Sequence, residues 1–152
     1  RDEDFFKWVK IISTRKCLHP SFSYVDFDSY VSATFYSIKT DRVNLKYLTW
    51  LLNSKVIEFW LKYKGKMQWD NYQIDKDPLI SIPIKQIWED KEKDFIDLVD
   101  KVLEITKKDL YDSKNIWEEQ KELERKIDDM VYDLYGFDLE WEEVKIIEKS
   151  LK

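Results

Sequence analysis

The second half of the chain carries two long segments whose apolar residues recur at spacings of three and four. This period, over residues 90–108 and 114–135, is typical of the buried seam between packed helices. The connector of residues 109–113 is short enough to make the two helices antiparallel neighbours. The sequence therefore predicts a helical hairpin with arms about 30 Å long. Its seam is formed by Phe95, Leu98, Val102 and Ile105 on one helix, and by Ile116, Gln120, Leu123, Ile127, Met130 and Leu134 on the other.

The first half carries the shorter patterns of a small sheet with helices. Apolar runs and alternation predict antiparallel strands within residues 8–12, 21–24 and 30–38, with a polar connector at 15–20. Asn44 and Ser54 are placed to cap helices over 45–52 and 55–63, and Gly65 to end the second. Residues 72–74 and 79–82 are predicted as short strands. Pro83 would stand at a strand end, where a missing N–H does little harm.

A last helix follows the hairpin. Gly136 is expected to end the second arm, and Asp138 to cap a helix whose buried side is Val144, Ile147 and Leu151. The first turn of this helix is acidic, which suits the positive end of the helix dipole, with Glu140, Glu142 and Glu143. The fold class predicted from these patterns is α+β: a small, mostly antiparallel sheet with packed helices, then an antiparallel helical hairpin and a C-terminal helix.

Charge divides the chain at the same place. Residues 1–86 contain 14 Lys and Arg against 10 Asp and Glu, and residues 87–152 contain 12 against 21. A net charge of +4 is thus joined to one of −9, and 16 of the aromatic residues lie in the basic part against 8 in the acidic part. Such asymmetry suggests that one end meets a polyanion, although two solvated faces would give the same numbers. We therefore expect a recognition core at 1–86 and helices packed on it at 87–152.

Scarce residue types exclude several kinds of chemistry. With two glycines, the chain lacks the glycine-rich loops that hold nucleotide phosphates. One cysteine and one histidine cannot build a four-ligand zinc site. The single cysteine also excludes an internal disulfide and favours a cytoplasmic location. No apolar stretch approaches ~18 residues, so no transmembrane helix is expected. Arg1 in place of an initiator Met suggests a fragment of a longer protein.

Polar, aromatic and basic residues gather between Lys62 and Gln73, a mixture that suits DNA reading. Lysines contact phosphates, Asn and Gln pair with adenine edges, and aromatic rings stack on bases. The phosphate-contacting candidates are Arg15, Lys16, Lys62, Lys64 and Lys66. The base-reading or groove candidates are Gln68, Asn71 and Gln73, with His19, Trp69 and Tyr72 as further members. The lysines also fit a solvated helix end, and the aromatics a core.

Other constellations have plainer readings. Cys17 and His19 could form a nucleophile pair on one strand face, or be a small apolar thiol beside a loop histidine. The acidic pairs Asp26/Asp28 and Asp75/Asp77 could bind Mg²⁺, or lie in solvated turns. The run of residues 89–91 (Glu-Asp-Lys) matches half of a nuclease motif without a strand-borne partner before it. No catalytic residue is predicted.

Three segments resemble one family. Residues 47–59 (YLTWLLNSKVIEF), 79–84 (LISIPI) and 127–137 (IDDMVYDLYGF) stand in the order found in TaqI-like C-terminal specificity domains. These domains occur in N6-adenine DNA methyltransferases, including type IIG restriction-modification enzymes, and the order is also similar to target recognition domains of type I specificity subunits. Phe137 stands where Leu is commoner in the family.

The resemblance implies a division of labour. An N-terminal methyltransferase domain of the same chain would bind S-adenosylmethionine and carry the Asn-Pro-Pro-Tyr motif. Neither that motif nor the glycine-bearing cofactor loop occurs in this sequence. A fused endonuclease, where present, would use Mg²⁺. This part would recognise double-stranded DNA while the target base is extruded. The alternative is a protein-interaction module in which the helical hairpin docks a partner. Exposed apolar residues along the hairpin would favour that alternative, and a polar outer face would favour DNA reading.

Overall fold

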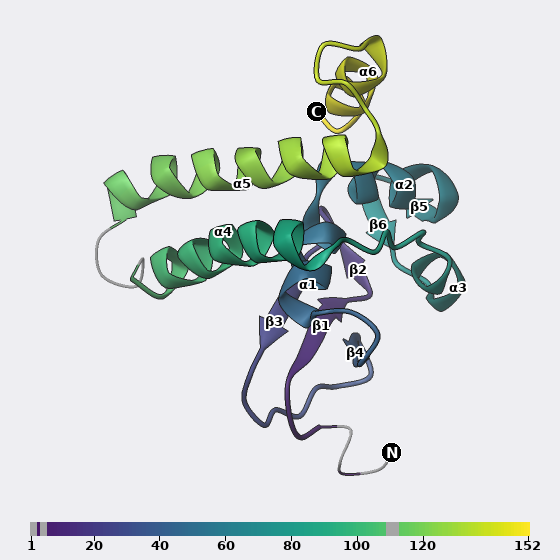
Figure 1. Cartoon of the computed structure of the whole chain (residues 1–152). Coiled ribbons are helices and arrows are strands. Elements are labelled where there is room, and N and C mark those ends of the chain that lie inside the picture. The colour runs from purple at the N-terminus through teal and green to yellow at the C-terminus, as the bar shows by residue number, and fades with distance from the viewer. Residues whose placement is uncertain (1–2, 4–5, 109–112) are drawn as a thin grey trace. The chain divides into compact units, whose positions relative to one another are not determined.

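The protein is described by a computed structural model over residues 3, 6–108 and 113–152. It divides into two compact units, residues 1–84 and residues 85–150. Within the described residues, the strands of the first unit form two three-stranded antiparallel sheets. The second unit is helical (Figure 1). The predicted α+β class is thereby confirmed, with two small sheets in place of one.

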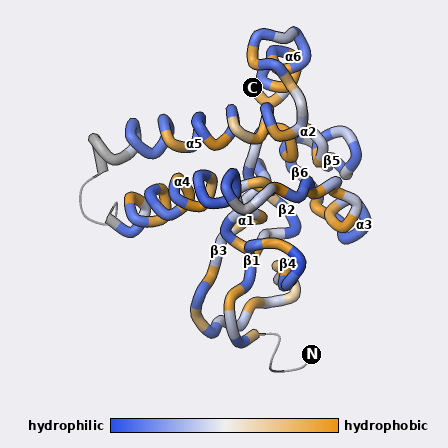
Figure 2. Tube along the Cα trace, viewed as in Figure 1, coloured by the Kyte–Doolittle hydropathy of each residue, from blue (hydrophilic) through white to orange (hydrophobic). Residues whose placement is uncertain are grey.

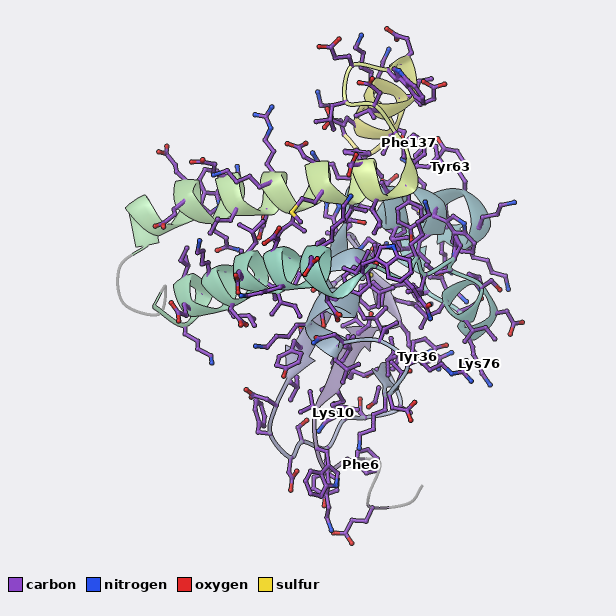
Figure 3. All side chains as sticks on the ribbon, viewed as in Figure 1. Phe6, Lys10, Tyr36, Tyr63, Lys76 and Phe137 are labelled. Carbon is purple, nitrogen blue, oxygen red and sulfur yellow. The ribbon has the colours of Figure 1, made fainter. Side chains whose placement is uncertain are left out.

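The first sheet has β1 (Lys10–Thr14) between β3 (Phe22–Val25) and β4 (Phe35–Ile38). Ile11 is fully buried and lies opposite Tyr24 on one side and Ile38 on the other. Lys10 is also fully buried, and its ammonium donates to the carbonyls of Phe6, Trp8 and Phe27 at 2.7, 3.2 and 3.0 Å. These bonds tie the segment before β1, and the loop after β3, to the sheet. Figure 3 labels Lys10 and Phe6.

Two predicted strands differ from the observed ones: β1 has five residues but lies two residues further along the chain, and β4 is shorter than predicted. β1 begins at Lys10 because Trp8 has a φ of 72°, which no extended strand accommodates. The strand predicted over residues 30–38 is limited to β4, because the hydroxyls of Ser32 and Thr34 bond each other at 2.6 Å and the N–H of Phe35 bonds Ser32 O. Local side-chain bonds of this kind replace ladder bonds and favour a turn.

Helix α1 (Leu45–Asn53) packs on the first sheet and α2 (Lys55–Lys64) follows it directly. Both predicted caps are confirmed: Asn44 Oδ1 accepts from the N–H of Lys46, and Ser54 Oγ from that of Ile57. Asn53, at the break between the helices, bonds both the N–H and the C=O of Phe22 in edge strand β3. The polar interruption at residues 53–54 therefore ends α1, starts α2 and attaches the sheet.

The second sheet has the order β2 (Lys16–Cys17), β6 (Asn71–Gln73), β5 (Lys66–Gln68). Strand β2 falls where a connector was expected. The strand predicted over residues 79–82 is wrong, because residues there belong to helix α3 (Lys76–Ile80) and the turn after it. Pro78 occupies the first turn of α3, where the missing N–H costs no helical bond, and Ser81 Oγ closes the end on Asp77 O at 2.6 Å. Pro83 accordingly stands outside any strand.

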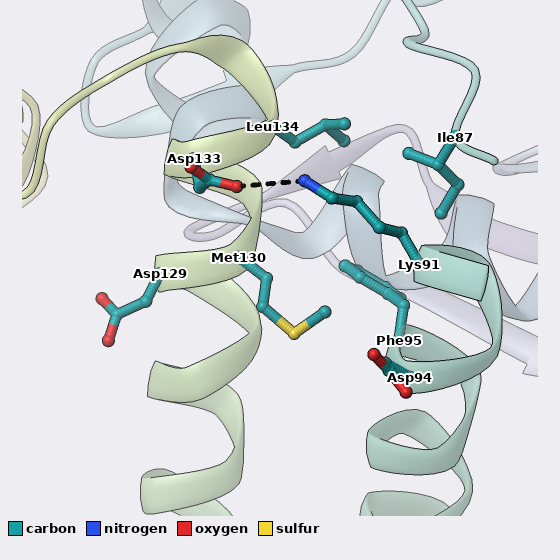
Figure 4. A pocket seen from close by; sticks show the side chains of 8 residues that line it. All are labelled: Ile87, Lys91, Asp94, Phe95, Asp129, Met130, Asp133 and Leu134. Atoms are coloured by element: carbon teal, nitrogen blue, oxygen red, sulfur yellow. Dashed lines mark ion pairs between the residues drawn. The ribbon is translucent and has the colours of Figure 1, made fainter.

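The second unit contains α4 (Glu89–Lys108), α5 (Ser113–Tyr135) and α6 (Glu142–Ser150). Helices α4 and α5 lie side by side, and the start of α4 meets the end of α5, where Lys91 pairs with Asp133 at 3.6 Å (Figures 1 and 4). They are therefore antiparallel, as predicted, although most of the connector of residues 109–113 lies outside the described residues.

Apolar and polar stretches alternate along both helices of the hairpin (Figure 2). Phe95, Val102 and Ile127 are buried as predicted, whereas Leu98 is only half-buried and its neighbour Val99 is fully buried. Gln120 donates to Glu124 of its own helix. The side chain of Ile116 lies outside the described residues.

The end of α5 is a Schellman motif. Gly136 has a φ of 81°, its N–H bonds Asp133 O, and the N–H of Phe137 bonds Tyr132 O, both at 2.9 Å. The rings of Tyr132 and Phe137 meet edge to face across this turn. Asp138 does not cap α6 as predicted. Its carboxylate accepts from the N–H of Glu140 in a turn, and α6 begins only at Glu142.

Candidate functional site

One face of the second sheet collects polar side chains from all three of its strands. Gln73 of β6 lies opposite Lys16 of β2 and Lys66 of β5, and Asn71 lies opposite Gln68. Side chains two residues apart on a strand point to the same side. The five residues Lys16, Lys66, Gln68, Asn71 and Gln73 therefore share one face, here called the polar face. All are exposed except Gln73, which is half-buried.

The opposite face of the same sheet carries the row of Cys17, Tyr72 and Met67. Tyr72 in the middle of this row is 5% exposed, whereas Cys17 is half-buried and Met67 is exposed. Burial, followed by the neighbouring Glu58 carboxylate, raises the pKa of Tyr72 above its usual range. Tyr72, predicted as a groove residue, is thus a core residue that fixes which way the sheet faces.

Contacts within the polar face hold its side chains in place. Lys16 Nζ donates to Gln68 Oε1 at 2.9 Å. Asp75, just after β6, accepts from Gln73 Nε2 at 3.1 Å and pairs with Lys66 at 3.2 Å. These two partners, Gln73 first, lower the pKa of the Asp75 carboxyl. Asp75 was not predicted as part of this surface, because its contacts with Gln73 and Lys66 depend on a strand pairing that the sequence alone does not specify.

Trp69 forms the tip of the β5–β6 hairpin. It is the first of two turn residues between Gln68 and Asn71, and its side chain is 91% exposed. Its φ is 59°, whereas Asp70 has no positive φ. A positive φ at the first central position only is the pattern of a type II′ turn, which normally has glycine there. A tryptophan in this conformation costs on the order of 1–3 kcal/mol.

The remaining candidates lie around the polar face or away from it. Arg15 immediately precedes β2; its carbonyl accepts from the N–H of Ile74, and its guanidinium lies 5.2 Å from the ring centre of Tyr36. Lys62 and Lys64 occupy the last turn of α2, two residues apart, so they point to different sides of that helix. Lys66 belongs to strand β5, so Lys62, Lys64 and Lys66 do not form a single row along α2.

His19 is placed elsewhere. It lies in the loop after β2, and its Nδ1 is 3.1 Å from Glu58 Oε1 of α2. Burial raises the pKa of the Cys17 thiol. An activated nucleophile requires the opposite shift, so the structure gives no support to a Cys17–His19 pair. Among the described residues, no group of three or more His, Cys, Asp and Glu side chains could hold a metal ion.

The two glycines test whether this chain could hold S-adenosylmethionine. A Cβ at Gly65 would meet Leu61 O at 2.5 Å, and Gly136 carries the left-handed turn after α5. Both glycines therefore serve helix ends. These residues do not fit a cofactor-binding loop.

The hairpin presents a largely polar exterior. Among the described residues of α4 and α5, the exposed large apolar residue is Trp117. Lys121 Nζ lies over its ring, 3.3 Å from the ring centre. A cleft of about 330 Å³ between the helices is lined by four apolar and four charged side chains, including the Lys91–Asp133 pair (Figure 4). In the part of the chain that is described, no helix is long and apolar enough to cross a membrane.

The family model described as the TaqI-like C-terminal specificity domain matches residues 1–84, more than half of the 152-residue chain. The matched range includes both sheets, helices α1–α3, and two of the three segments on which the resemblance rests. No curated protein matches the chain.

Proposed function

The chain belongs to the family of TaqI-like C-terminal specificity domains, and from this membership we propose that it reads the target sequence in double-stranded DNA. The parent protein would be an N6-adenine DNA methyltransferase of a restriction-modification system. Its N-terminal domain would bind S-adenosylmethionine, and a fused endonuclease, where present, Mg²⁺. In this proposal the present chain positions DNA and takes no chemical step itself.

The observation that carries the proposal is the polar face. Side-chain amides can bond two atoms of an adenine edge at once, and this face carries three: Gln68, Asn71 and Gln73. Lys16 and Lys66 stand in the same row as Gln73, where phosphate oxygens could displace their present partners. Groups that read bases and groups that hold the backbone are thus brought to one surface.

The dimensions of this surface suit a DNA groove. Neighbouring strands are about 4.8 Å apart, so three strands span about 10 Å, and the major groove is about 12 Å wide. A two-stranded ribbon fits that groove. The β5–β6 hairpin is such a ribbon, and its two turn residues put Gln68 and Asn71 next to its tip. Arg15, Lys62 and Lys64 are proposed as further phosphate contacts.

The test is a base-preference profile of the full-length protein. Wild type and an Asn71→Ala variant would each select duplexes from a randomised pool. Loss of a bidentate contact should relax preference at one base pair by about 1–3 kcal/mol and leave the other positions unchanged. Gln86→Ala, an exposed amide outside both sheets, is the matched control and should keep the wild-type profile. Unchanged profiles in Asn71→Ala and in Gln68→Ala would refute base reading by this face.

Lys66→Ala separates phosphate contact from base reading. It should weaken binding to all duplexes alike and reduce the slope of log affinity against log salt by about 1. A wild-type slope in this variant would remove Lys66 from the phosphate contacts.

The alternative function, docking of a partner by the helical hairpin, receives less support. Docking of this kind requires exposed apolar residues along the hairpin. Among the described residues of α4 and α5, the exposed large apolar residue is Trp117, and Lys121 covers its ring. The charged exterior of α4 and α5 instead suits contact with solvent.

A further inference from the structure

The conformation of Trp69 is favoured neither by packing nor by the backbone. Trp69 is 91% exposed, so it contributes almost nothing to the core. Its φ of 59° is one that glycine adopts freely and tryptophan rarely does. An exposed aromatic residue in a strained turn is the kind of feature that serves an interaction outside the chain.

The neighbours of Trp69 indicate what it would meet. Gln68 and Asn71 flank the turn and belong to the polar face. Amides that contact base edges would therefore bring the indole to the same one or two base pairs. The indole ring has one N–H donor and no acceptor, so it cannot read the hydrogen-bonding edge of a base pair as an amide does. It can, however, stack on the face of any base.

We infer that Trp69 inserts its ring between neighbouring bases of the duplex held by the polar face and stacks on one of them. This inference rests on the proposed function and adds a second kind of contact to it. Insertion of an apolar or aromatic wedge unstacks a base step and kinks the duplex. The two-residue turn limits the motion of the backbone that carries the ring, so the strain is already present before DNA binds.

Trp8 provides a matched control. It is also highly exposed, at 73%, and has a similar φ of 72°. However, it precedes β1 of the first sheet, where its N–H bonds the Asp28 carboxylate and its carbonyl accepts from Lys10. Replacement of either tryptophan by glycine removes one exposed indole and relieves one positive φ, so neither change should unfold the protein.

The experiment compares full-length wild type with Trp69→Gly, Trp69→Phe and Trp8→Gly on the duplex that wild type selects. Affinity is measured by titration, and bending by energy transfer between dyes on the duplex ends. Trp69→Gly should bind roughly 5- to 150-fold more weakly, the usual effect of losing one base–aromatic stack. It should also leave the duplex unbent. Trp69→Phe should bend the duplex as wild type does, and Trp8→Gly should match wild type in both measurements.

Three outcomes would overturn the inference. Trp69→Gly could bind and bend DNA as wild type does, Trp8→Gly could lose as much affinity as Trp69→Gly, or wild type could leave the duplex straight. In each case the proposed function stands if Asn71→Ala still relaxes base preference. Failure of wild type to select any duplex is a different result, because it removes the proposed function and this inference together.

Discussion

The hydroxyl of Tyr132 is buried without a hydrogen-bond partner among the described residues. The residue is 1% exposed, on α5 beside the turn at Gly136. Burial first, and then the carboxylates of Asp128 and Glu148, raise its pKa. An unpartnered buried hydroxyl costs free energy that a phenyl ring of the same shape does not.

Tyr132→Phe should therefore raise the free energy of unfolding by about 1 kcal/mol at neutral pH. A raised folded pKa means that stability is complete below the unfolded value, about 10, and falls as pH rises toward the folded value. The advantage of the variant should accordingly widen above about pH 10. Urea unfolding of the full-length protein at neutral pH and near pH 10.5 measures both effects. A variant less stable than wild type would show that the hydroxyl has a bonding partner.

At the residue scale, the sequence predicted residue types better than their orientations. The helix caps Asn44 and Ser54 and the C-cap Gly136 follow from local chemistry, and the structure confirms them. Tyr72, a groove candidate for which a core position was the alternative, is buried, and a single amphipathic aromatic residue does not reveal in the sequence which face is buried. The positive φ of Trp69 was not foreseen, since a tryptophan is not a turn signal.

At the scale of elements, the long helices were the most predictable, because a period sustained over 20 residues leaves few alternatives. The short strands were less so. Residues 79–82 alternate like a strand, yet Pro78 and Ser81 complete a helical turn there. Strand β2 is two residues long, and its pairing with β6, more than 50 residues later, could not be read from local pattern.

Asn53 tests the attachment of α1 to the first sheet. Asn53→Ala would leave the N–H of Phe22 without its side-chain acceptor and the C=O of Phe22 without its donor. Because Phe22 is 3% exposed, water cannot readily replace these bonds, and the expected loss is about 1–3 kcal/mol in the free energy of unfolding. Chemical unfolding measures it. Thr40→Ala, at an exposed loop bond to Arg42, should cost much less. Equal losses in the two variants would contradict the role given to Asn53.

At the scale of the whole molecule, the charge asymmetry parallels the division into two units. The family match and the proposed DNA-reading surface both fall in the basic, aromatic-rich first part. The five residues of the polar face were all among the sequence candidates. Their meeting on one face depends on two strand pairings that the sequence alone did not specify.

Photo-crosslinking of the full-length protein to its selected duplex, with the sites mapped by mass spectrometry, tests the central claim most directly. Crosslinks should fall on the β5–β6 hairpin, residues 66–73, and on β2, and should disappear with an excess of unlabelled selected duplex. Crosslinks confined to α4, α5 and α6, with the hairpin peptides unmodified, would contradict the claim that the polar face reads DNA.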